Sequence, residues 1–423
     1  MTESHRYSRQ RLAWFILSAS FFTCLLLTIA IPVAINTYLQ NAGQSLDVTV
    51  QANQGTVGIE EPNGPRRAVL VGEPAQTISS QASIRTDTTA SALMMVMLPN
   101  QVEPLLTMQV ASNSTIQMEG ATAPRFRLSD NSNQVNIDLQ AGRIRLDVPP
   151  LSDRPLDITV TTPQDGRVLV AEPGRYMLEV SNDATQAHAF GPGQVTVTAQ
   201  GQSLTLGPGQ RAEIALGSPP QGPLDPARDL IRNGDFSQGL DNWVLFSWQV
   251  ELPDQPKGET TVQPDGGDPA LRLTRQGVGH ADVRLTQTVN QDVSDYETLR
   301  LAATLRIVDH SLGVCGVQGS ECPLFFIINY IDDTGVNRVW QHGFFANGTI
   351  DDNATPGACI SCAVVQRPHD RVPLNQLYFY DVDLIQELAS QGALPPRYIE
   401  SLTIVGSGHS FTTEVSDVAL IVE

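Results

Sequence analysis

The chain has 423 residues, which is long enough for two or three domains that each bury a core of their own. It carries 26 Lys and Arg against 45 Asp and Glu, a formal net charge of -19. An acidic chain without a basic stripe does not neutralise phosphate backbones, so the charge argues against nucleic acid as a partner.

The N-terminus is the one segment with an excess of positive charge. Its first eleven residues hold Arg6, Arg9 and Arg11 against Glu3. No charged residue follows until Asp47, and the apolar run would span about 34 Å as a helix, which is enough for a bilayer core. We expect a cytoplasmic tail over 1–11 and a transmembrane helix over 12–36. Positive charge stays inside, so the chain is expected to be a single-pass protein of the cell membrane with its bulk extracytoplasmic.

A cleaved signal peptide is the alternative interpretation of this segment. The apolar run is longer than the usual signal core of about 7–15 residues. Pro32-Val33-Ala34 is also a poor small-x-small cleavage site. The length therefore favours a permanent anchor, and both alternatives remain open.

Residues 47–216 form a succession of short runs, such as "DVTVQA", "RIRLDV" and "QVTVTA", that mostly alternate apolar with polar residues. This is the period of a half-buried strand, and no helical pattern interrupts it. Glycine begins several runs, where we expect it to supply a positive φ for a tight turn. These glycines are Gly142, Gly174, Gly193 and Gly209.

The segments "LQAGRIRLDV", "ITVTTPQDGRVLVAEPGRYMLEV" and "LGPGQRAEI" resemble the extracytoplasmic FecR-like domain. The resemblance covers about 170 residues of the chain, 47–216. Known members of that family relay a signal to a sigma factor through a cytoplasmic region. Here that region is eleven residues, too short to fold, so the resemblance implies the domain without the anti-sigma role.

A Pro- and Gly-rich stretch, "LGSPPQGPLDPARD", predicts a linker over 217–228. Residues 229–423 again form strands and suit a β-sandwich. Asp332-Asp333-Thr334-Gly335 predicts a hairpin turn. One helix is expected in "DVDLIQELAS", with Asp381 or Asp383 as its N-cap. The fold class predicted is all-β, with an N-terminal transmembrane helix, a FecR-like β domain and a jelly-roll β-sandwich.

The stretch "NGDFSQGLDNW" begins this last region and resembles the entry of carbohydrate-binding, galactose-binding-like jelly-roll modules. The resemblance implies that Phe236 and Trp243 are core residues. It also implies a structural calcium held by Asn233, Asp235 and Asp417, with backbone carbonyls completing the shell. In the alternative interpretation Asp235 only caps a turn and Asp417 starts a strand.

Sugar recognition needs exposed aromatic rings flanked by hydrogen-bonding groups. The candidate ligand-binding residues are Trp248, Tyr330, Trp340, Gln341, His342, Phe344 and Tyr378, and Tyr380 is a further aromatic candidate. Aromatic residues of a sandwich are more often core residues, so packing is the alternative for each.

Four cysteines lie in two close pairs, Cys315 with Cys322 and Cys359 with Cys362. Outside the membrane they most simply form two disulfides, in any of three pairings. A zinc site completed by His310, His342 or His369 is one alternative, and a redox Cys-x-x-Cys pair is another.

Motifs of the common hydrolase, metalloprotease and nucleotide-binding sites are absent from the sequence, so we expect no enzyme. Two functions fit the sequence. The first is a membrane-anchored sensing protein that binds a glycan or envelope polymer. The second is a structural or assembly protein that contacts other envelope proteins.

Overall fold

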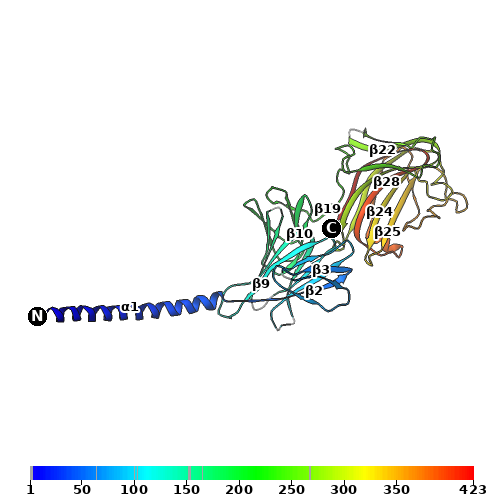
Figure 1. Cartoon of the computed structure of the whole chain (residues 1–423). Coiled ribbons are helices and arrows are strands. Elements are labelled where there is room, and N and C mark those ends of the chain that lie inside the picture. Colours follow the sequence, from blue (N-terminus) through cyan, green and yellow to red (C-terminus); the bar gives the residue numbers. More distant parts are fainter. Residues whose placement is uncertain are drawn as a thin grey trace. The chain divides into compact units, whose positions relative to one another are not determined.

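The computed structural model describes residues 3–62, 64–99, 101, 103–150, 154–163, 165–265 and 268–423 (Figure 1). The chain divides into two compact units, Met1–Asp225 and Pro226–Glu423. Within the described ranges, strands make up almost all the regular structure beside one long and one short helix. The predicted all-β fold class is therefore confirmed.

Helix α1 (Glu3–Asn41) is long and apolar enough to cross a membrane. Its window Trp14–Asn41 has a mean hydropathy of 2.2, and none of that window is buried in the protein. The helix extends beyond the predicted span of 12–36 at both ends, because neither flank holds a glycine, and the only proline, Pro32, lies within the apolar run.

The C-terminal end of α1 is hydrogen-bonded to the loop 125–132 within the first unit. Gln40 Nε2 donates to the Leu128 carbonyl at 2.9 Å, and Gln40 Oε1 accepts from the Asp130 amide at 3.1 Å. The rings of Tyr38 and Phe126 lie 5.8 Å apart. Helix and β-structure are therefore joined through direct contacts.

The first unit is built from two connected sheets. Its strands are β1 (Gly43–Ser45), β2 (Asp47–Gln54), β3 (Thr56–Glu60), β4 (Arg66–Leu70), β5 (Gln76–Ile78), β6 (Ser83–Arg85), β7 (Ser91–Met97), β8 (Pro104–Val110), β9 (Thr115–Pro124), β10 (Asn133–Val148), β11 (Leu156–Thr162), β12 (Gly166–Val170), β13 (Gly174–Val180), β14 (Ala184–Ala189), β15 (Val195–Ala199), β16 (Gln202–Leu206), β17 (Gln210–Ala215) and β18 (Gln221–Leu224).

Strand β10 belongs to both sheets. Its first half pairs with β9 and, in parallel, with β11, whereas its second half pairs with β8 and β13. Alternate residues of most strands are buried, as in β7, and they form one apolar core. The predicted half-buried strands are thus the strands of this core.

Glycine acts in two ways in this unit. Gly142 lies where β10 passes from one sheet to the other and has a φ of +86°, which favours glycine as predicted. Gly193 has no positive φ; a Cβ there would lie 2.0 Å from the Tyr176 hydroxyl. Gly174 has no positive φ either, and a Cβ there would lie 2.9 Å from the same hydroxyl, so the turn explanation is wrong for Gly174 and Gly193, where close packing favours glycine.

The predicted linker 217–228 is shorter in the structure. Its residues Gln221–Leu224 form β18, which pairs with β17 of the first unit. Strand β19 (Arg228–Asp229) pairs with the last strand of the second unit. Backbone pairing at both ends leaves residues 225–227 between the units, although proline and glycine are frequent in this stretch.

The second unit has its own strands and one short helix. These are β19 as given, β20 (Val244–Trp248), β21 (Glu259–Asp265), β22 (Asp268–Asp292), β23 (Leu299–His310), β24 (Leu324–Asp332), β25 (Asn337–Phe345), β26 (Asp370–Arg371), β27 (Tyr378–Asp383), α2 (Leu384–Ser390) and β28 (Pro396–Val422).

Two long strands, β22 and β28, run through both layers of this unit. In one layer, the first half of β22 pairs with β21 on one side and with the second half of β28 on the other. The second half of β28 also pairs with β23, and β23 pairs with β27. In the other layer, the second half of β22 pairs with β20 and with the first half of β28. The first half of β28 also pairs with β24, and β24 pairs with β25. The ring of Tyr380 on β27 stacks on Phe326 of β24 at 6.2 Å, so the two layers enclose a common core.

A buried arginine lies where the two long strands pass between layers. Arg275 is 1% exposed and donates to the carbonyls of Pro256, Gly279 and Gly408, each at 2.8 Å. The β22–β28 register shifts directly after it, between Gln276 and Ala281. The guanidinium thereby joins β22, β28 and the segment before β21 through their backbone carbonyls at this irregular point.

Three local predictions are confirmed in this unit. Asp332 caps the β24–β25 turn by accepting from the Thr334 and Val336 amides. Asp383 is the N-cap of α2 and accepts from the Ile385 amide. Phe236 and Trp243 are core residues, with ring centroids 5.6 Å apart.

Candidate functional site

Most of the predicted ligand-binding aromatics lie inside the sandwich. Tyr330, Trp340, His342 and Phe344 are each at most 1% exposed, and Gln341 is 8% exposed. Tyr380 is buried and Tyr378 is half-buried on β27. The side chain of Trp248 lies outside the described residues. The rings of Tyr330, Trp340 and Phe344 pack between the two layers, so these residues do not form an exposed binding platform.

The buried rings of Trp340, His342 and Tyr380 form a stack that contains several polar atoms. His342 lies 5.4 Å from Tyr380 and 6.1 Å from Trp340, in both cases stacked. Among the described residues, no hydrogen-bond partner is found for Trp340 Nε1, Tyr330 Oη or Tyr380 Oη. Burial raises the pKa of Tyr330 and of Tyr380, so both hydroxyls keep their protons at neutral pH.

Charged groups border this stack at the edge of β25. Asp370 Oδ2 lies 3.2 Å from His342 Nε2 and 3.0 Å from Arg367 Nη2. Burial alone would raise the pKa of Asp370, but the contacts with His342 and Arg367 outweigh it and lower the pKa. The Arg367 guanidinium lies 5.9 Å from the Tyr380 ring centroid, in cation–π range.

A pocket of about 630 Å³ opens next to this region. Its walls come from β25, from the segment 364–366 that hydrogen-bonds to β25 through Val365, and from the turn after α2. The lining residues are Arg338, Val364, Val365, Gln366, Gln391, Gly392, Ala393 and Leu394. The volume is in the range of small-ligand sites, and the polar lining groups are a guanidinium and two carboxamides.

Arg338 is held in this pocket by a buried carboxylate. Its Nε donates to Asp332 Oδ2 at 2.9 Å, and Tyr330 is its cross-strand neighbour. Burial tends to raise the pKa of Asp332, but hydrogen bonds from Thr334, Arg338 and the Val336 amide outweigh it and hold the pKa at about 2. The carboxylate is therefore ionised at neutral pH and fixes the guanidinium.

The two carboxamides differ in what they offer a ligand. Gln366 is committed to the chain, since it accepts from the Cys359 amide at 3.2 Å and donates to the Cys359 carbonyl at 2.6 Å. Gln391 Nε2 donates to Glu387 Oε1 at 2.8 Å; within the described part of the chain its Oε1 has no donor, so it can accept from a group such as a ligand hydroxyl. The sequence analysis did not predict Arg338 or Gln391 as ligand-binding residues. The one available signal was that Arg338 lies two positions before the candidate Trp340 in the sequence.

The predicted calcium donors are engaged in the entry loop. Asn233 Oδ1 accepts from the Gln238 amide, and Asp235 Oδ1 accepts from the Ser237 amide and hydroxyl. Asp235 thus caps a turn, as in the alternative interpretation. Asp417 does not start a strand but lies within β28, with a φ of +52°. These hydrogen bonds neither form nor exclude a calcium shell, because each accepting oxygen keeps a second lone pair and Asp235 has a second carboxylate oxygen. Calcium binding by Asn233, Asp235 and Asp417 stays a prediction from the sequence.

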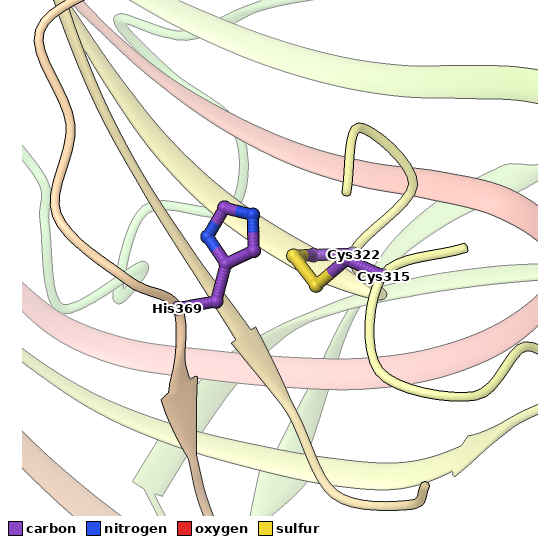
Figure 2. A group of neighbouring side chains, drawn as sticks. All are labelled: Cys315, Cys322 and His369. Atoms are coloured by element: carbon purple, nitrogen blue, oxygen red, sulfur yellow. A yellow bond between two sulfur atoms is a disulfide. The ribbon is translucent and has the colours of Figure 1, made fainter. Parts of the chain in front are cut away.

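The cysteines form the disulfides Cys315–Cys322 and Cys359–Cys362, which confirms two loop disulfides and selects one of the three pairings. His369 lies beside the first of them, as Figure 2 shows. Burial lowers the pKa of His369 to about 4, although its hydrogen bond to the Gly319 carbonyl opposes this. The imidazole is therefore neutral at neutral pH.

No known protein family and no curated protein sequence matches the chain. Among solved structures it is similar to a family 11 carbohydrate-binding module from Clostridium thermocellum in complex with a β-1,3-1,4-mixed-linked tetrasaccharide. The identity is 13%, the TM-score 0.28, and the match covers 46% of this chain and 94% of that one. It is also similar to TmCBM61 in complex with β-1,4-galactotriose, at 12% identity and a TM-score of 0.26 over 46% and 99% of the two chains.

A third similar structure is a provisionally assigned anti-sigma factor from Parabacteroides distasonis. It is 14% identical, with a TM-score of 0.25, over 39% of this chain and 66% of that one. Likenesses of this size carry no functional argument, and the FecR-like family of the first unit stays a prediction. Function has to be argued from the residues of this chain.

Proposed function

We propose that the chain is a membrane-anchored, extracytoplasmic protein that binds a glycan or envelope polymer, without catalysis, through the pocket of its second unit. The observation that carries the proposal is the pocket of about 630 Å³ with Arg338 and Gln391 in its wall. A guanidinium and a carboxamide oxygen offer donors and an acceptor to sugar hydroxyls, while Leu394 and Val364 offer apolar contact to ring carbons.

The anchor and the compartment are supported by α1 and by the two disulfides. An exposed apolar helix of this length is suited to a bilayer. Disulfides persist outside the cytosol. Protease treatment of intact cells that make the full chain tests the orientation: digestion of the part beyond residue 50 is expected, and protection of that part would contradict it.

Binding is tested with the full chain in detergent against a panel of soluble polysaccharides, by isothermal titration calorimetry. Arg338→Ala is expected to reduce affinity for the recognised polysaccharide at least tenfold, because the pocket loses its guanidinium. Arg300→Ala is the matched control, since Arg300 has the same side-chain exposure, 48%, and also pairs with one aspartate. Equal affinity of the Arg338 and Arg300 variants, or no binding to any polysaccharide, would refute the pocket as a glycan site.

A second candidate function is assembly through protein contacts. Strand β20 is at one end of the strand order of its sheet and exposes Val244, Leu245 and Phe246, at 65, 47 and 38%. An apolar edge strand can pair with another β-protein. Sedimentation of the full chain in detergent tests self-association: a dimer that Leu245→Lys converts to a monomer would favour assembly, and a monomer at all concentrations would argue against it.

A further inference from the structure

The disulfide Cys315–Cys322 and His369 form a fully buried group beside strands β24 and β25. The cysteines come from the loop between β23 and β24, and His369 immediately precedes β26 (Figure 2). Both cysteines are 0% and His369 is 4% exposed. One ligand atom of each residue lies within 4.8 Å of those of the other two, which is close enough for a single ion to contact all three.

The imidazole of His369 is held in the tautomer that a metal requires. Its Nε2 lies 2.7 Å from the Gly319 carbonyl, which can only accept, so the proton is on Nε2. Nδ1 therefore carries a lone pair, and it is buried without a hydrogen-bond partner among the residues described. A ring N–H bound to a backbone carbonyl is the usual outer contact of a metal-ligating histidine.

Strand β25 leaves room for these groups at a glycine. A Cβ on Gly343 would lie 2.4 Å from Cys322 Sγ and 2.8 Å from His369 Nδ1. The sulfur and the unpartnered nitrogen therefore meet over the same backbone position. Phe325 closes the group, with its ring 5.5 Å from the His369 ring in an edge-to-face contact.

From this geometry we infer that Cys315, Cys322 and His369 form a zinc site that is available only when the disulfide is reduced. A dithiol reductant transfers two electrons and two protons to the disulfide, becomes a disulfide itself, and leaves two cysteine thiols. Zn²⁺ then binds the two thiolates and His369 Nδ1, with release of two protons. Three protein ligands leave one tetrahedral position for water or a small ligand. This site is independent of the glycan pocket proposed above.

Zinc would take over the role of the disulfide in closing the loop 315–322. That loop is bound to the second disulfide segment, since the Ile360 amide donates to the Gln318 carbonyl at 3.0 Å and the Ser361 hydroxyl donates to Gln318 Oε1 at 2.9 Å. With either the disulfide or the metal in place, the two chain ends at Cys315 and Cys322 remain joined. Only the reduced, metal-free form lacks this link.

The test uses the full chain in detergent, with Cys359→Ser and Cys362→Ser introduced together so that the second cysteine pair cannot bind metal. Cobalt(II) is the probe, because thiolate ligands and tetrahedral coordination give it characteristic absorption bands. After reduction with a phosphine and its removal, one cobalt per chain with thiolate charge-transfer bands is expected, and the oxidised protein is expected to bind none. Zinc should displace the cobalt and abolish the bands.

Addition of His369→Gln to the same protein tests the third ligand. Cobalt affinity is expected to fall at least tenfold, and the d–d bands are expected to weaken as the ligand set changes. The comparison of oxidised with reduced protein needs no change at His369, so the inference stays testable even if that variant fails to fold. It is overturned if the reduced protein binds cobalt no better than the oxidised protein, or if a folded His369→Gln variant binds with unchanged affinity and spectrum.

Discussion

His280 Nδ1 lies 2.8 Å from Glu321 Oε1, so strand β22 is bound to the loop that carries the first disulfide. The other ring nitrogen, Nε2, lies 3.2 Å from Gln249 Oε1 and 3.3 Å from Asp282 Oδ1. Because both nitrogens face acceptors, the imidazolium form is favoured. The contacts with Asp282 and Glu321 raise the pKa of His280 to about 9, although burial opposes them.

This pair makes the stability of the second unit depend on pH. The pKa of His280 is raised on folding, so its contribution is complete below about pH 6.5, declines as pH rises, and is lost above about pH 9. We expect the free energy of unfolding to fall by about 1–3 kcal/mol across this range. Urea unfolding followed by tryptophan fluorescence measures it, and His280→Gln should remove this part of the pH dependence. An unchanged slope in the variant would contradict the assignment.

Arg275 predicts a graded loss of stability. Arg275→Met leaves several buried carbonyls without donors, so we expect a loss of about 3–5 kcal/mol. Arg275→Lys keeps the charge but has fewer donors. Its free energy of unfolding is expected to lie between those of Arg275→Met and the natural protein. Urea unfolding measures both. Equal stability of the Lys variant and the natural protein would show that charge alone, and not the fork of donors, stabilises this corner.

Gly234 in the entry loop is too close to β28 to accept a side chain without loss of stability. A Cβ on Gly234 would lie 1.8 Å from the Val418 carbonyl oxygen. The Val418 amide also donates a hydrogen bond to the Gly234 carbonyl at 3.0 Å. Gly234→Ala is expected to destabilise the second unit by about 1–3 kcal/mol, because the loop must move off β28. Gly313→Ala is the control, since its nearest neighbour is 3.8 Å away. Similar thermal midpoints for the two variants would be evidence against the tight contact.

Asp332 is expected to support polysaccharide binding by fixing the Arg338 side chain in the pocket. Asp332→Asn keeps an oxygen for the Thr334 and Val336 amides but removes the charge that holds the guanidinium. We expect polysaccharide affinity to fall about tenfold, with a stability loss of about 1–2 kcal/mol. Asp381→Asn, which removes the partner of Arg300, is the matched control. Binding equal to that of the control would show that Arg338 needs no fixed orientation.

The sequence predicted those elements whose signals are local. Asp332 at the turn, Asp383 at the cap and Phe236 in the entry loop each lie within a few residues of the groups they contact. Local spacing also selected the cysteine pairs, although the pairing itself required the structure.

The candidate site was harder to predict because β25 is buried on both faces from Trp340 to Phe345, and no alternation along the strand signals this. In "RVWQHGFF" the set Trp340, His342 and Phe344 proved to face inward, so the apparent binding rings are core residues. The pocket joins Arg338 on β25 with Gln391 after α2, and no local pattern connects two such distant positions. A β-sandwich places such residues together only once its layers have closed.

Because β22 and β28 each contribute hydrogen bonds to both layers, we expect the two layers to unfold together. Amide protons of β25 and β27, which lie in different layers, should therefore exchange with solvent through the same rare global opening. A ligand that stabilises one edge of the module would slow exchange throughout it, including strands that the ligand never touches.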